Sequence, residues 1–152
     1  MNTEPTTTFI DEYGYKTEEW RNNEGRLHRE DGPATISYNP DGTVMCEAYY
    51  QHGQLHRDNG PATISYRDDG TVYQEDYCQN GKLHRENGPA RIFYNQDGTT
   101  RHKEYWQGGK QYTPTTRDVK NTLNTKLEAI KQRNNTKTPV VKHDRKPGRT
   151  LS

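Results

Sequence analysis

Three histidine–arginine pairs recur along the chain at intervals of 28 residues. Each pair opens the same heptapeptide, His-Arg-acid-x-Gly-Pro-Ala, and the pairs are His28-Arg29, His56-Arg57 and His84-Arg85. A histidine close to a carboxylate can act as a general base or contribute to a metal site. These six residues are therefore the first candidates for chemistry in the sequence.

The spacing of the three pairs argues against both kinds of chemistry. If each period forms one β-hairpin, equivalent atoms in successive periods lie two strands apart, roughly 10 Å. Two ligand atoms of one zinc ion can be at most about 4 Å apart, so one ion cannot join two of these histidines. A catalytic group is singular and sits in a pocket, whereas this group recurs along an open surface. We therefore expect no enzyme activity, no metal and no cofactor.

We expect the histidines and arginines to form a structural ladder. In this interpretation the imidazole and guanidinium groups hold the connector between hairpins, with Glu30, Asp58 or Glu86 as local partners. The glycines fall at turn spacing and not in a phosphate-binding pattern. A purely structural role is thus the prediction for all six side chains.

The repeat is wider than the heptapeptide. Residues 52–79 and 80–107 match at 15 of 28 positions, and such a period indicates stacked units of one kind. In the middle unit Ala62, Ile64 and Tyr66 alternate with polar residues, which is typical of a half-buried strand. Residues 67–70 predict a turn, and residues 71–79 predict a return strand. Strict alternation along that strand puts four side chains on one side: Thr71, Tyr73, Glu75 and Tyr77.

These patterns predict a mostly β fold. The expected architecture is a single antiparallel meander of stacked β-hairpin repeats over residues 10–113, with one apolar face, after a flexible N-terminus at 1–9. Residues 14–20 read as a degenerate half unit, and residues 109–112 read as the start of a fourth unit that is not completed. Drift of this kind is expected at the ends of a stack.

The last part of the chain has a different pattern. Within the segment 114–133, apolar residues at helical spacing predict one amphipathic helix over 116–133. Residues 134–152 are polar and basic and are expected to form a disordered tail. Residues 1–115 hold 12 basic and 18 acidic side chains, whereas residues 116–152 hold 10 basic and 3 acidic ones. Candidate electrostatic residues of the tail are Lys137, Lys142, Arg145, Lys146 and Arg149.

Two sets of equivalent positions, each 28 residues apart, vary in residue type but keep large or polarizable side chains. Residues needed for stacking must recur, but surface residues are free to diverge. We therefore expect an open face that binds a protein partner, because exposed apolar patches usually mark contact sites. The six candidate contact residues are Met45, Tyr50, Tyr73, Cys78, Arg101 and Trp106.

Two other partners remain open as alternatives. The segment 116–152 could associate with nucleic acid through its basic residues. It could also attach to an anionic membrane surface, although its lack of aromatic residues argues against that. The tyrosines that recur at 38, 66 and 94 fit core packing better than a base-stacking platform, because the acidic body would repel phosphates. Nothing in the sequence indicates the oligomeric state.

The compartment is predicted from what the sequence lacks. Residues 1–5 show no basic region followed by an apolar run, and no apolar stretch approaches membrane-spanning length. The two cysteines, Cys46 and Cys78, lie 32 residues apart and so fall out of repeat register. No structural disulfide is expected, and a cytoplasmic setting fits.

The glycine-punctuated hairpins, with an aromatic-x-x-x-Gly in each unit, resemble MORN repeats. They resemble more specifically the MORN-variant group whose units carry an HRxxGPA core, and the resemblance covers about residues 14–112. It implies a curved hairpin sheet used for protein contacts. Chains of this group look like products of bacteria, phages and large DNA viruses, and some bacterial relatives are described as antitoxin-like. The expectation is thus a non-enzymatic protein-binding module, and the resemblance implies that it inhibits a host or partner protein.

Overall fold

The computed structural model describes residues 4–135 and divides the chain into two compact units, 1–115 and 116–152. Unit 1 is a mostly β domain built from antiparallel hairpins, as predicted. The one helix among the described residues, α1 (Thr116–Asn135), lies in unit 2, begins where the sequence predicted and runs two residues further. The basic tail residues 137–149 lie outside the described residues.

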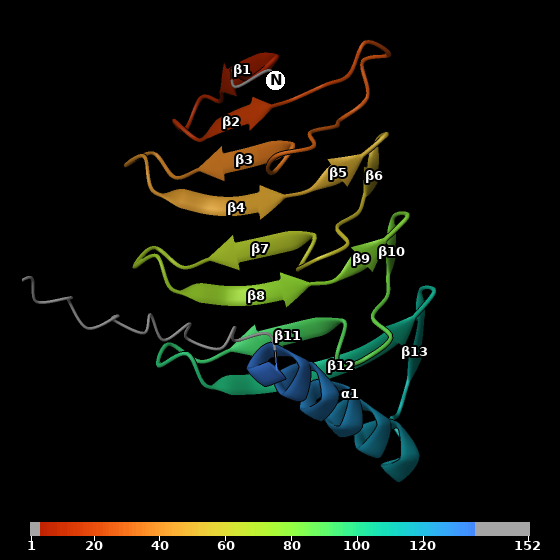
Figure 1. The fold of residues 1–152 in the computed structure, drawn as a ribbon. Helices are drawn as coiled ribbons and strands as arrows, with labels where there is room; N and C mark the ends of the chain where they lie inside the picture. The colour runs from red at the N-terminus through yellow and green to blue at the C-terminus, as the bar shows by residue number, and fades with distance from the viewer. Residues whose placement is uncertain (1–3, 136–152) are drawn as a thin grey trace, which may run out of the picture. The chain divides into compact units, whose positions relative to one another are not determined.

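The four main hairpins of unit 1 follow the 28-residue period. Their strands are β1 (Thr7–Ile10) with β2 (Lys16–Glu19), β3 (Thr35–Tyr38) with β4 (Val44–Ala48), β7 (Thr63–Tyr66) with β8 (Val72–Asp76), and β11 (Arg91–Tyr94) with β12 (Thr100–Gln107). The first strand of each hairpin pairs with the second strand of the hairpin before it. The result is the ladder of strands in Figure 1.

The return strands do not run straight through to the next turn. After β4 and β8 the chain breaks at Tyr49 and Tyr77 and forms small two-stranded sheets, β5 (Tyr50–Gln51) with β6 (Gln54–Leu55) and β9 (Cys78–Gln79) with β10 (Lys82–Leu83). In the last unit β12 is continuous and pairs with β13 (Lys110–Tyr112). Figure 1 shows these small elements following one another along one end of the main strands. The single continuous return strand predicted for residues 71–79 is therefore wrong.

The N-terminal end of the stack is also fuller than predicted. β1 starts at Thr7, which lies 28 residues before Thr35, and its hairpin with β2 is complete. Residues 7–9 of the segment expected to be flexible, and the half unit at 14–20, are thus parts of a first repeat, while residues 1–3 lie outside the described part of the chain. At the other end, residues 110–112 form β13, which closes the last repeat and does not open a new one.

The core is thin, as the low apolar content requires. The alanines of the heptapeptide, Ala34, Ala62 and Ala90, are completely buried directly before β3, β7 and β11. The other buried apolar side chains among the described residues are Trp20, Ala48, Cys78 and Ile92. Most strand residues are half-buried, because a single sheet layer leaves both of its faces partly open.

One face of the main sheet repeats from unit to unit, and we call it the recurring face. It carries the isoleucines 36, 64 and 92, which pair across strands with glutamates. Three equivalent tyrosines donate hydrogen bonds to a glutamate of the preceding hairpin, at 2.8–2.9 Å: Tyr38 to Glu18, Tyr66 to Glu47 and Tyr94 to Glu75. The tyrosine columns thus pack within the stack.

Candidate functional site

The three histidines link each repeat to the next. The Nδ1 atom of His28, His56 and His84 accepts a hydrogen bond from a backbone N–H located 24 residues further on, at 3.3, 3.2 and 3.0 Å. The carbonyl of the leucine before each histidine accepts a second bond from a glycine of that same later turn. The histidines therefore act as acceptors between units, which requires an unprotonated Nδ1.

The three arginines hold the connector by two contacts each. Their guanidinium groups lie over an aromatic ring at 3.9, 3.7 and 3.6 Å: Arg29 over Trp20, Arg57 over Tyr49 and Arg85 over Tyr77. Each guanidinium also donates to the carbonyl of the heptapeptide proline, four residues on. Stacking together with a planar donor is specific to arginine, since lysine offers only a point charge.

The local acidic partners were only partly predicted. His56 Nε2 lies 3.2 Å from Asp58 Oδ1, but within the described residues Glu30 and Glu86 make no equivalent ion pair. The bonds that recur in all three units go to backbone atoms of the next turn. In the described part of the chain no group of three or more histidine, cysteine or acidic side chains is placed to hold a metal ion.

The opposite face of the main sheet differs from repeat to repeat, and we call it the variable face. In the first strands of the hairpins, Thr63 and Ser65 give way to Arg91 and Phe93. In the second strands Cys46 is followed in register by Gln74 and His102, and Ala48 by Asp76 and Glu104. The side chains grow larger and more charged toward β8, β11 and β12.

Three of the predicted contact residues sit at one special position of the variable face. The pairing register shifts by one residue in three hairpins, which leaves an unpaired bulge residue at Met45, Tyr73 and Arg101. A bulge reverses the alternation that follows it. Tyr73 therefore does not share a side with Glu75 and Tyr77, as strict alternation predicted, but joins the variable face.

Two of the bulge residues, Tyr73 and Arg101, form a cluster with the rings of Phe93 and His102, which we call the ring cluster. Tyr73 meets Phe93 edge-on, with ring centroids 6.0 Å apart, and Phe93 lies 5.9 Å from the ring of His102. The guanidinium of Arg101 lies 5.6 Å from the Tyr73 ring and 5.7 Å from the Phe93 ring. Arg101 and His102 are exposed and the two rings are half-buried. Aromatic and arginine side chains in this state are typical of binding surfaces.

The other predicted column lies deeper than expected. Cys78 is 5% exposed, so it cannot belong to an open contact surface, and that part of the prediction is wrong. Burial raises the pKa of its thiol to about 11, which also keeps it protonated and unreactive. Tyr50 and Trp106 are half-buried. Strands β5 and β9 pair with β6 and β10, and this pairing draws the column inward.

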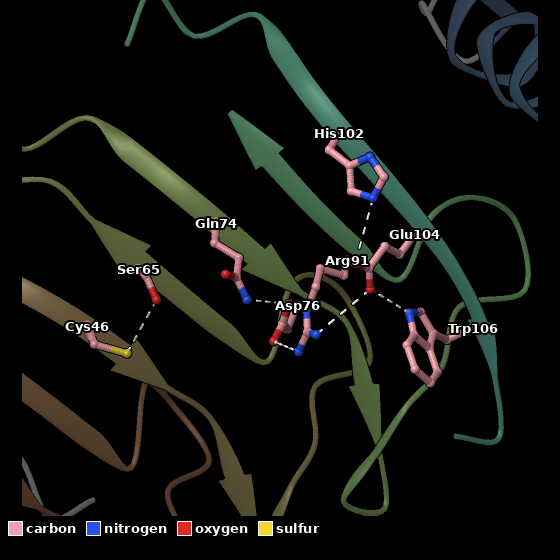
Figure 2. A network of polar contacts seen from close by, with 8 residues as sticks. All are labelled: Cys46, Ser65, Gln74, Asp76, Arg91, His102, Glu104 and Trp106. Atoms are coloured by element: carbon pink, nitrogen blue, oxygen red, sulfur yellow. Dashed lines mark hydrogen bonds and ion pairs between the residues drawn. The ribbon is translucent and has the colours of Figure 1, made fainter. Parts of the chain in front are cut away.

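A network of charged and polar side chains crosses the variable face and includes His102 of the ring cluster (Figure 2). Arg91 donates two hydrogen bonds to Asp76, at 2.8 and 2.9 Å, and its guanidinium lies 3.8 Å from Glu104. Glu104 in turn accepts a hydrogen bond from the Trp106 indole at 3.0 Å and lies 3.7 Å from His102. These contacts fix Trp106 at the edge of the cluster.

Sequence reasoning missed half of this surface. It selected Tyr73, Arg101 and Trp106 but not Arg91, Phe93 or His102. The signal was present, because the same rule of comparing equivalent positions 28 residues apart marks Ser65 to Phe93 and Gln74 to His102 as changes.

Two equivalent hollows, of about 330 and 420 Å³, lie between successive heptapeptide segments. Both are lined mainly by polar groups, including the arginines of two successive heptapeptides and acidic side chains next to them. The arginines are already engaged with rings and proline carbonyls, so these hollows follow from the stacking of the repeats.

Two further observations bear on function. No helix among the described residues is long and apolar enough to cross a membrane. Comparison of the chain with protein-family models, with curated proteins and with solved structures finds no match.

Proposed function

We propose that this chain is a non-enzymatic protein-binding module, with its contact surface on the variable face of β8, β11 and β12. The observation that carries the proposal is the contrast between the two faces of one sheet. The isoleucines and tyrosines of the recurring face are kept from unit to unit. On the other face Thr35 and Ser37 recur as Thr63 and Ser65, but every residue that β11 and β12 place there differs from its equivalent in the unit before. Positions that differ while the fold repeats are free of the packing constraint.

The chemistry of the variable face supports a protein partner. Tyr73, Phe93, Arg101 and Trp106 belong to the residue types that dominate binding energy at protein interfaces. The Asp76–Arg91–Glu104 network pins the neighbouring side chains, which lowers the entropy lost on binding. Its carboxylates are paired with cations and an indole, so none is held ready as a general base.

The nature of the partner follows from the resemblance to MORN-variant repeats alone. It favours a host or partner protein that this chain inhibits, in a phage or bacterial setting and in the cytoplasm. Association with nucleic acid through 116–152 is the competing proposal, supported by the basic composition of that segment.

The test starts with capture of partners on the tagged full chain, with and without nuclease treatment. With a purified partner, Tyr73→Ala and Trp106→Ala should each weaken binding by about 2 kcal/mol, roughly thirtyfold in Kd. Tyr13→Ala is the matched control, because Tyr13 is an aromatic residue 73% exposed in the β1–β2 turn, away from the variable face. Circular dichroism should show the same fold for all three variants.

The competing reading gives a different pattern. If removal of residues 134–152 abolishes binding, while the Tyr73 and Trp106 variants bind normally, the sheet is only a scaffold. Binding that disappears with nuclease and falls steeply with salt would point to nucleic acid.

A further inference from the structure

The main sheet has two open strand edges, one on β1 and one on β12, and these two strands are the repeat equivalents of β11 and β8, which pair with each other inside the chain. Strand β1 has a sheet partner on one side only, β2. Among the described strands, β13 pairs with residues 105–107 of β12, so residues 100–104 of β12 have β11 as their only strand partner. Because β1 is in register with β11, and β12 with β8, these open edges correspond to the two strands that meet in the β8–β11 pair.

From this equivalence we infer that copies of this chain associate head to tail, with β12 of one copy paired antiparallel to β1 of the next. The register follows from the internal pair, in which Arg91 lies opposite Asp76 and Phe93 opposite Gln74. Strand β1 lies three periods before β11, and β12 lies one period after β8. Applied to these two strands, the same register sets Thr7 opposite Glu104, Thr8 opposite Lys103 and Phe9 opposite His102.

The side chains at the two edges suit this pairing. Phe9 and Ile10 on β1 are 50% and 66% exposed. Large exposed apolar side chains on an uncharged edge strand favour pairing with a strand of another chain. In the internal pair Phe93 packs against Tyr73, and the residue that follows Tyr73 by one period is Arg101. The ring of Phe9 would thus meet the guanidinium of Arg101, a cation–π contact.

The charges at the edges also favour pairing of unlike edges. Residues 101–103 of β12 are Arg, His and Lys, whereas β1 itself contains no charged residue. A basic edge repels another basic edge, which disfavours β12 against β12. The pairing of unlike edges is heterologous, so it produces open chains of copies and not closed dimers.

One contact of the internal interface is not reproduced, and it provides a sharp test of the register. Gln96 donates a 2.8 Å hydrogen bond to Asp69 in the preceding turn. The equivalent of Gln96 at the first turn is Glu12, and the equivalent of Asp69 at the last turn is Asp97. Two carboxylates would therefore face each other, so Glu12→Gln should tighten association.

The main experiment is sedimentation of the full chain over a range of concentrations. The mean mass of the wild type should rise with concentration through species larger than a dimer. Phe9→Lys should block the β1 edge, and Arg101→Glu should block the β12 edge, each raising Kd at least tenfold, about 1.4 kcal/mol. Phe9 is 50% exposed and Arg101 is exposed, and circular dichroism checks that both variants fold.

Mixing the two variants distinguishes the modes of association. Head-to-tail pairing predicts that association returns in the mixture, because each variant supplies the edge that the other lacks. If Arg101→Glu alone still associates, β1 pairs with β1; if Phe9→Lys alone still associates, β1 takes no part. Either result, a wild type that stays monomeric, or a Glu12→Gln variant no tighter than the wild type, would overturn the inference.

Discussion

Replacement of His56 tests the role assigned to the histidine ladder. The side chain is 15% exposed, and its Nδ1 atom accepts the Asn80 N–H at 3.2 Å. His56→Leu keeps most of the buried volume but removes the acceptor, so it should lower the free energy of unfolding by about 1 kcal/mol. The contact of Nε2 with Asp58 adds little, because that carboxylate is 69% exposed.

His56→Asn is the matched control. The side-chain oxygen of asparagine can take the place of Nδ1, so this variant should recover much of the loss seen with leucine. Combining leucine substitutions at His28, His56 and His84 should cost about 3 kcal/mol, because sites roughly 10 Å apart contribute nearly additively. That is a large part of the 5–15 kcal/mol or so that stabilises a typical domain.

Urea unfolding followed by circular dichroism measures these differences, and nitrogen NMR of the imidazoles reports the tautomer. All three rings should carry their proton on Nε2, because Nδ1 accepts. The reasoning fails if the leucine variant is as stable as the wild type, if asparagine is no better than leucine, or if the rings are protonated at Nδ1.

Three further predictions concern titratable groups. Hydrogen bonds from the Thr71 hydroxyl and N–H lower the pKa of Asp69 to about 2, so the stability it contributes is present above about pH 4 and is lost as pH falls toward 2; Asp69→Asn should shrink this acid-sensitive part of an unfolding curve. Burial and the hydrogen bond to Glu18 raise the pKa of Tyr38 to about 12, so its stabilising effect is present below about pH 10 and is lost as pH rises through 12. The pKa values of the equivalent Tyr66 and Tyr94 are raised as well, so absorbance at alkaline pH should show several late-ionising tyrosines, and Tyr38→Phe should remove one of them. The thiol of Cys78 should react with a thiol reagent only at the rate of unfolding, and fast labelling of the folded protein would contradict its burial.

Periodicity was sufficient to predict the repeated hairpins. Alternation of Ala62, Ile64 and Tyr66 identified the buried side of the first strand, because side-chain direction in a strand depends only on position. In the first repeat, the half unit at 14–20 was predicted but strand β1 was not, because Thr7 to Ile10 lacks a preceding heptapeptide like those that mark the other hairpins. This strand is held by pairing with β2, a contact between segments that local composition does not report.

The candidate site was harder to predict because a bulge depends on pairing. Tyr73 looks like any other strand residue in the sequence, and only the register of Ser65 with Gln74 and of Tyr66 with Val72 reveals that it is unpaired. The depth of Cys78 likewise follows from the break at Tyr77, where the backbone leaves the main sheet. The acceptor role of the histidines depends on a turn 24 residues away, beyond the reach of a local pattern.

The same 24-residue links have a consequence for how the domain folds. Hydrogen bonds join each repeat to its neighbour over short sequence separations. The bonds to the histidines span 24 residues, and the bond from Arg101 to Tyr73 spans 28. Contacts of such short sequence separation cost little loop-closure entropy, so a repeat can form against whichever neighbour is already folded. Folding can therefore start at an interior repeat and spread in both directions, and the terminal repeats, with one neighbour each, should exchange their amide protons first.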